Sequence, residues 1–135
     1  MKLTKERAIA EHRKMWLWIS RQIMKDYSAS RRVRVIYLYK REYLNKVYPN
    51  ERIRNECFCC DYVEQSGIDC CIDCYRDCPL YWNNKHTEYT CSEHFGYYNI
   101  IARISTMCHN FCTSKEAKKM AIMAYKIAML EEKEQ

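Results

Sequence analysis

Hydrophobic residues recur at helical spacing near the start of the chain. In residues 4–27, apolar side chains such as Trp16 and Ile19 fall on one stripe, while charged residues fill the other positions. Thr4 stands directly before a run of good helix formers and suits an N-cap position. The pattern predicts a long amphipathic helix in which His12 packs in the core and is not a metal ligand.

The end of the chain carries the clearest helix signal. Thr113 is followed three residues later by Glu116, which is the spacing of a capping box. Apolar residues then continue at helical spacing and predict a buried face. This face consists of Ala117, Met120, Ala124, Ile127 and Leu130. The glutamates within 131–134 lie at the negative end of the helix dipole, so we expect the tail to fray.

Residues 92–110 show a further helical pattern. Ser92 suits the N-cap, and four apolar residues recur at helical spacing after it. The predicted stripe consists of Ile100, Ile104, Met107 and Phe111. We therefore expect residues 92–130 to form the C-terminal helices.

The segment 31–54 mixes basic and aromatic residues. It holds eight Lys or Arg residues against two Glu residues, so its charge equals the net +6 of the whole chain. Its alternating valines and tyrosines fit a strand, and its apolar spacing fits a helix equally well. We expect a short extended piece that runs into a helix ending before Pro49, because proline disfavours helix at the preceding residue.

Composition limits the class of protein. The chain has 135 residues with only two glycines and two prolines, which fits a single domain over 1–135 without long flexible linkers. Its first residues lack the apolar run of a signal peptide, and no stretch reaches the roughly 20 apolar residues of a membrane span. The ten cysteines are therefore expected in a reducing cytoplasm, as thiols or metal ligands, with disulfides as the alternative.

Seven of the ten cysteines gather at the start of a cysteine-rich segment, residues 57–91, that has little periodicity. The first pair has Cys-x-x-Cys spacing, at which one tight turn directs two sulfur atoms to one zinc ion. The predicted ligands are Cys57, Cys60, Cys74 and Cys78, with Cys71 as the alternative. Four thiolates form a closed site that holds structure and activates no water, so we predict a structural Zn²⁺.

A second metal site is a further use of the remaining cysteines. Its ligands would be Cys91, His94, Cys108 and Cys112. The last two are one helical turn apart and share a face if the helix at 92–110 continues. Buried thiols that pack as small hydrophobic side chains are the other explanation.

These patterns predict a mainly α protein. An N-terminal and a C-terminal helix would pack around a central zinc-stapled loop region, with a short strand pair as a further element. No βαβ pattern surrounds the Cys-x-x-Cys, and neither a phosphate-binding glycine loop nor a zinc-deaminase signature is present. We therefore expect no enzymatic activity.

Several short motifs follow one another in an order that is familiar from one family. They are EHRKMWLWI in the first helix, Glu42-Tyr43, Cys57-x-x-Cys60 followed by Asp61-Tyr62, Cys78-Pro79-Leu80-x-Trp82, and Ile127-Ala128-x-Leu130. In these motifs, across most of its length, the chain resembles small cysteine-rich proteins encoded by phages and prophages of Firmicutes. That family pairs a Cys-x-x-Cys with a later Cys-x-x-Cys-Pro, whereas this chain has one more residue between Cys74 and Cys78.

The resemblance implies a phage accessory protein in the host cytoplasm, without an assigned reaction. Proteins of that kind block host machinery, including CRISPR and other defences, and this step is an analogy. We expect binding to a host protein, or to a protein–nucleic acid complex, with inhibition or modulation as the result. The expected contact residues are Arg31, Arg32, Arg34, Tyr37, Tyr39, Arg41 and Tyr43. Packing of these tyrosines in the core is the other explanation.

Nucleic-acid binding is the alternative function of the basic segment. Its arginines would contact phosphates and its tyrosines would stack on bases. On either hypothesis, charge reversal at Arg31, Arg32 and Arg34 is expected to weaken binding and to leave stability nearly intact.

Overall fold

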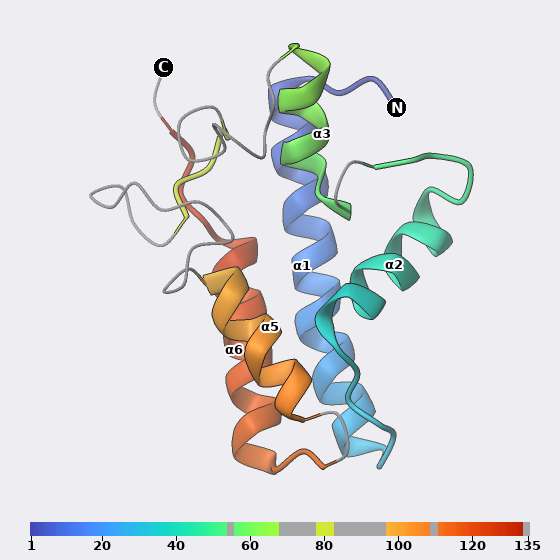
Figure 1. Ribbon diagram of the computed structural model, residues 1–135, viewed down its shortest axis with the longest axis vertical. Helices are drawn as coiled ribbons and strands as arrows, with labels where there is room; N and C mark the ends of the chain where they lie inside the picture. The colour runs from blue at the N-terminus through green and yellow to red at the C-terminus, as the bar shows by residue number, and fades with distance from the viewer. Residues whose placement is uncertain (54–55, 68–77, 83–96, 109–110, 134–135) are drawn as a thin grey trace.

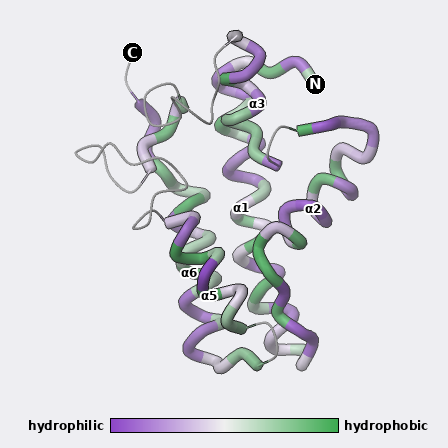
Figure 2. The backbone as a smooth tube through the Cα atoms, in the orientation of Figure 1, coloured by the Kyte–Doolittle hydropathy of each residue, from purple (hydrophilic) through white to green (hydrophobic). Residues whose placement is uncertain are grey.

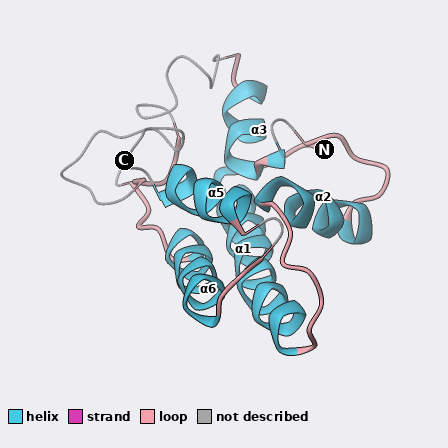
Figure 3. Cartoon of the chain, turned by 60° about the horizontal axis from the view of Figure 1, so that its bottom comes forward, coloured by secondary structure: helices cyan, strands magenta, loops and turns pink. Residues whose placement is uncertain are grey.

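Five helices account for most of the described part of the chain (Figures 1 and 3). The computed structural model describes residues 1–53, 56–67, 78–82, 97–108 and 111–133. The helices are α1 (Lys5–Ser28), α2 (Ile36–Val47), α3 (Phe58–Gln65), α5 (Tyr97–Met107) and α6 (Ser114–Ala128). The predicted mainly α fold is confirmed. The expected strand pair is not found within these ranges, which hold one antiparallel bridge between Leu80 and Glu132.

Helices α1 and α6 form the centre of the molecule and run antiparallel (Figure 1). Near one end of the pair, the His12 ring is hydrogen-bonded to the carbonyl oxygen of Ile127. Near the other, the Ser20 hydroxyl donates to the carbonyl oxygen of Ala121 at 2.7 Å. Helices α2, α3 and α5 pack around this pair, and apolar residues of all five helices form one core cluster. Hydrophobic and hydrophilic positions alternate along the helices (Figure 2).

The predicted caps of α1 and α6 are both present. The Thr4 hydroxyl accepts the amide of Arg7 at 3.2 Å, so α1 begins where the sequence predicts. In α6, the Thr113 hydroxyl accepts the amide of Glu116 at 3.1 Å, and the Glu116 carboxylate accepts the amide of Thr113 at 3.1 Å. Because caps depend on neighbouring residues alone, they could be predicted from sequence.

Helix α2 follows an extended stretch and ends before Pro49, as predicted. Its N-cap residue, Val35, has no side chain able to accept a hydrogen bond from the first turn. The Ser105 hydroxyl of α5 accepts the amide of Ile36 at 3.1 Å instead. Another helix therefore supplies the capping group for α2.

The predicted apolar stripe of residues 92–110 is confirmed for Ile100 and Ile104, which pack partly buried against the core, and is wrong for Met107 and Phe111. The structure buries Ile101, Ser105 and Cys108, whereas Met107 and Phe111 are each 75% exposed. The helix is rotated toward its Ser105 side because this hydroxyl reaches the N-terminus of α2. The predicted N-cap of this helix, Ser92, lies outside the described residues.

The tail after α6 is held in place up to Lys133, contrary to the expected fraying. The amide of Tyr81 donates to the carbonyl oxygen of Glu131 at 2.9 Å. The amide of Lys133 donates to the carbonyl oxygen of Pro79, also at 2.9 Å. Leu130, just before this pairing in sequence, is buried in the main core. Because α6 ends at Ala128, the glutamates follow the helix and do not extend it.

Candidate metal centre and binding surface

The first Cys-x-x-Cys pair forms a tight turn at the start of α3. Cys57 is the N-cap of this helix, and its sulfur atom accepts the amide of Cys60 at 3.4 Å. Glu56, just before it, has a positive φ of 48°, which turns the chain into the helix. An amide-to-sulfur hydrogen bond lowers the cost of negative charge on a thiolate. The turn is suited to a metal-bound Cys57.

Adjacent cysteines in this turn face different surroundings. Cys59 and Phe58 are fully buried in the main core, where the Phe58 ring packs against Tyr48 with centroids 5.8 Å apart. Cys60 belongs to a small separate cluster with Val63, and Cys57 is partly buried against both clusters. Successive helical residues point about 100° apart. This separates Cys59, a core side chain, from the predicted ligands on either side of it.

The rest of the predicted zinc site is only partly described. Cys78 is buried in the main core, and Cys74 and its alternative Cys71 lie outside the described residues. Within the described ranges, no group of three or more His, Cys, Asp or Glu side chains is arranged to hold a metal ion. The assignment of Zn²⁺ to Cys57, Cys60, Cys74 and Cys78 therefore stays a prediction.

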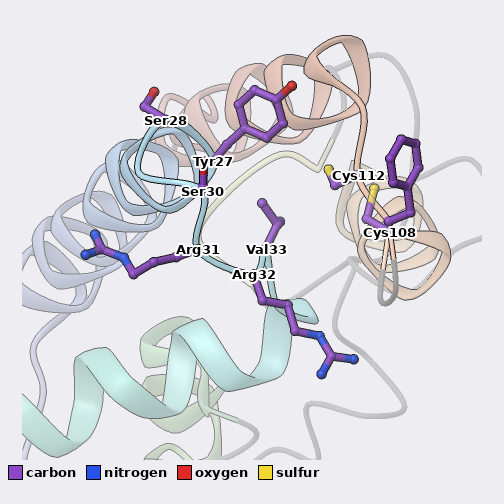
Figure 4. A pocket seen from close by; sticks show the side chains of 9 residues that line it. Tyr27, Ser28, Ser30, Arg31, Arg32, Val33, Cys108 and Cys112 are labelled. Atoms are coloured by element: carbon purple, nitrogen blue, oxygen red, sulfur yellow. The ribbon is translucent and has the colours of Figure 1, made fainter.

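Half of the second predicted metal site lines an open pocket of about 770 Å³ (Figure 4). Cys108 and Cys112 lie together at one end of the pocket, and both are free thiols. Burial and a hydrogen bond with Cys112 raise the pKa of Cys108 to about 12. The Cys108 thiol also donates to the Glu116 carboxylate at 3.6 Å. The other two predicted ligands, Cys91 and His94, lie outside the described residues.

Arg31 and Arg34 of segment 31–54 are paired with carboxylates of the same chain. Arg31 Nε lies 3.1 Å from the carboxylate of Asp26, which is itself 4% exposed. Arg34 pairs with Glu42 and lies 3.9 Å from the second oxygen of Asp26. Burial alone would lower the pKa of Arg34, but the hydrogen bond and charge of Glu42 outweigh it and raise that pKa. Charge reversal at these positions should therefore destabilise the fold, contrary to the prediction.

Two of the predicted contact residues belong to the core. Tyr39 is fully buried and its hydroxyl donates to Asp26 at 2.9 Å, while burial raises its pKa to about 12. Tyr43 is 7% exposed and packs against Trp18 with ring centroids 5.7 Å apart. Neither ring offers a face to a partner, so Tyr39 and Tyr43 are removed from the predicted binding surface. The explanation that tyrosines pack the core holds for these two.

Tyr37 and Arg41 remain on the surface of α2. The Tyr37 residue is 50% exposed, and the Arg41 guanidinium lies 5.4 Å from the centroid of its ring. Arg41 also lies 3.7 Å from the Glu56 carboxylate, beside the Cys57 turn. Of the predicted contact residues, Tyr37 and Arg41 therefore lie on the surface as an aromatic and cationic pair. Arg32 lines the wall of the pocket (Figure 4).

Asp26 is the organising residue that the sequence pattern did not identify. It accepts hydrogen bonds from Gln22, Arg31 and Tyr39, which come from α1, the α1–α2 connection and α2. A single aspartate near the end of a charged helix carries no local signal of burial. Its role depends on the packing of α2 against α1, a tertiary contact that local sequence does not reveal.

Comparisons with known proteins add no relative: the chain matches no protein-family model, no curated protein and no solved structure. Across the described ranges, none of the helices combines the length and apolar character needed to cross a membrane.

Proposed function

We propose that this chain is a zinc-stabilised binding protein that acts by binding a host protein and inhibiting or modulating it. The observation that carries the proposal is the exposed Tyr37–Arg41 pair on α2. A tyrosine has few rotatable bonds, and a stacked guanidinium restricts it further, so little entropy is lost on binding. Tyrosine and arginine are also enriched among residues that dominate binding energy in protein interfaces.

Structural zinc would support this function by fixing the cysteine-rich segment. The turn at Cys57 and Cys60 already has an amide aimed at sulfur. A closed thiolate site can contribute on the order of 10 kcal/mol to folding at neutral pH, comparable to the net stability of a small domain. Zinc held there would stiffen the Cys57 turn, and Glu56 beside this turn lies 3.7 Å from Arg41 of the Tyr37–Arg41 pair.

We favour a host protein as the partner for two reasons. One is the resemblance to phage proteins, and the other is that key side chains of the basic segment are paired or buried within the chain. Nucleic-acid binding needs cations free to replace counterions and aromatic faces free to stack. Arg31 and Arg34 are instead paired with Asp26 and Glu42, and Tyr39 is buried. These contacts weigh against the nucleic-acid alternative.

The test is an affinity capture from bacterial lysate with three forms of the chain. The wild type and Val47→Ala, a control at an exposed apolar residue of the same helix, should capture the same partner. The double variant Tyr37→Ala/Arg41→Ala should lose it by at least about tenfold. Equal capture by all three forms would contradict the proposal. So would tight binding of generic DNA or RNA that collapses on added salt, because that result favours the nucleic-acid alternative.

A further inference from the structure

Two open pockets adjoin each other at the connection between α1 and α2. One has a volume of about 640 Å³, and all the residues that line it are polar or charged, so we call it the charged pocket. The other, of about 770 Å³, is the pocket with Cys108 and Cys112, and we call it the aromatic pocket for its two ring side chains. Arg31 and Arg32 line both pockets, and their side chains leave the connection in different directions (Figure 4). Each volume lies in the range of small-molecule sites.

The charged pocket carries an excess of positive charge. Burial alone would raise the pKa of Glu42, but the hydrogen bonds and charges of Arg34 and Lys46 outweigh it and lower that pKa, so this carboxylate is ionised at neutral pH. Even with Arg32 left out, four cations face two carboxylates, which leaves two positive charges. The cations are Lys25, Arg31, Arg34 and Lys46, and the carboxylates are Asp26 and Glu42. A hollow lined by one excess charge concentrates its field and attracts anions.

The two carboxylates hold the guanidinium groups of this pocket in place. Asp26, 4% exposed, accepts a hydrogen bond from Nε of Arg31 at 3.1 Å. Arg34 pairs with Glu42 and lies 3.9 Å from the second oxygen of Asp26. Each guanidinium has three nitrogens with N–H donors, and the bond to Asp26 uses one of those of Arg31. A guanidinium that is already oriented loses little entropy when it binds an anion through two parallel hydrogen bonds.

The aromatic pocket offers rings and hydroxyl groups. Tyr27, from α1, and Phe111, which follows α5, line it together with Ser28 and Ser30 (Figure 4). Phe111 is 75% exposed, so most of its ring surface is uncovered. Nucleobases stack on exposed rings of this kind, and serine hydroxyls can both donate and accept hydrogen bonds. The chemistry of this pocket suits a planar aromatic group with polar edges.

We propose that the two pockets together bind a nucleoside monophosphate, with its phosphate in the charged pocket and its base in the aromatic pocket. A phosphate monoester carries about 1.5 to 2 negative charges at pH 7, which matches the excess of two positive charges. The sugar would lie beside Arg31 and Arg32, where the pockets meet. The inference is independent of the proposed function, because Tyr37 and Arg41 line neither pocket.

The charges favour a single nucleotide over a nucleic-acid strand. Each phosphodiester of a strand carries one negative charge, and strand binding requires cations along a track of several phosphates. Here the excess lies in one pocket, and Arg41, further along α2, lies 3.7 Å from the Glu56 carboxylate. A terminal phosphate with two negative charges fits this arrangement better than a chain of single charges.

The first experiment is isothermal titration calorimetry of the whole chain with AMP, GMP, CMP, UMP and inorganic phosphate. At least one nucleotide should bind about tenfold more tightly than inorganic phosphate, because the base adds a stacking contact. Lys25→Glu should weaken binding of both by about tenfold. Lys25 suits this test because it forms no ion pair with any described residue. Lys2→Glu, the matched control, makes the same change in net charge just before the other end of α1 and should bind like the wild type.

The second experiment separates the two halves of the site. Phe111→Ala should weaken nucleotide binding by about tenfold and leave the binding of inorganic phosphate unchanged. Tyr125→Ala is its control, because this ring is 53% exposed on α6 and lines neither pocket. Circular dichroism shows whether each variant keeps its helix content, and Lys25→Gln replaces Lys25→Glu if that variant does not.

Four results would overturn the proposal. They are no nucleotide binding up to about 1 mM, equal losses in Lys25→Glu and Lys2→Glu, no loss in Phe111→Ala, and binding of inorganic phosphate as tight as that of every nucleotide. Equally tight binding of an oligothymidylate without a terminal phosphate would also contradict it, since that result would indicate a site for strands.

Discussion

His12 donates a hydrogen bond from Nε2 to the backbone carbonyl oxygen of Ile127 at 2.8 Å, and so joins the first and last helices across 115 positions of sequence. The ring is 1% exposed and lies edge-on to Trp82, with ring centroids 5.9 Å apart. This bond requires the tautomer that carries its proton on Nε2. The histidine is therefore a core residue, as the sequence pattern predicts, and its burial favours the neutral form.

The first prediction concerns acid sensitivity. Burial lowers the pKa of His12 from 6.5 to about 4, against a smaller raising effect of the Ile127 bond. In the unfolded chain His12 takes up a proton near pH 6.5, so between that pH and about 4 the unfolded state binds more protons. The stability contributed by the neutral ring is thus fully present above pH 6.5 and is lost as the pH falls toward 4. We expect His12 to reduce the free energy of unfolding by about 2 kcal/mol between pH 7 and pH 5.

Urea unfolding at the two pH values, on the wild type and His12→Gln, measures this contribution. Glutamine can still donate to Ile127 but does not titrate, so the variant should lose about 2 kcal/mol less than the wild type on acidification. Other titrating groups, including any metal-bound thiolates, contribute equally to the pH dependence of unfolding in both proteins. An identical pH dependence in both would show that the histidine is not held neutral.

The second prediction concerns the buried hydroxyl of Tyr39. Tyr39→Phe leaves the Asp26 carboxylate without one of its hydrogen bonds in a buried site. We expect a loss of about 1–3 kcal/mol in the free energy of unfolding. Tyr37→Phe removes the same atom from an exposed ring and should be nearly neutral. Chemical denaturation of both variants checks the difference, and equal effects would contradict the placement of Tyr39 in the core.

The third prediction concerns the shared cap of α2. Ser105→Ala removes the acceptor of the Ile36 amide, which is buried, and should cost about 1–3 kcal/mol. Amide hydrogen exchange should rise most in the first turn of α2, although the substitution is in α5. Thr106→Ala is the control, because this exposed hydroxyl bonds only to Ala102 of its own helix. Unchanged exchange in α2 would show that Ser105 is not its cap.

The helices could be predicted because their signals are local. The capping box at Thr113 and the N-cap at Thr4 involve residues three positions apart, and both appear where expected. The rotation of α5 could not be predicted in the same way. It depends on Ser105 meeting the amide of Ile36, from a helix 69 residues away in sequence. Apolar spacing offers two overlapping faces in α5, and tertiary contacts with α2 and α6 select between them.

The predicted contact surface failed in part for a related reason. Charge and aromatic content identify segment 31–54 but do not show which side chains face inward. Asp26 draws Arg31 and Tyr39 toward α1, whereas Tyr37 stays exposed on the other side of α2. The zinc ligands pose the same difficulty, because several cysteine pairs share one spacing. Burial alone does not separate these cysteines, because Cys59 and the predicted ligand Cys78 are both buried in the main core.

The last prediction separates the zinc ligands from their neighbours. Replacing Cys57 and Cys60 with serine should release the metal and unfold the cysteine-rich segment, because the loss is on the order of 10 kcal/mol. Cys59→Ala is the matched control within the same turn and should retain the metal, with at most a modest loss of stability. Replacing both Cys108 and Cys112 with serine tests the second predicted metal site separately.

Native mass spectrometry of the purified chain measures bound metal most directly. We predict a mass that exceeds that of the chain by one or two zinc ions, with the first ion absent in the Cys57→Ser/Cys60→Ser variant and kept in Cys59→Ala. A folded chain with the mass of the polypeptide alone would contradict the structural-zinc account. So would a mass lowered by two hydrogens per cysteine pair, since that result would mean disulfides.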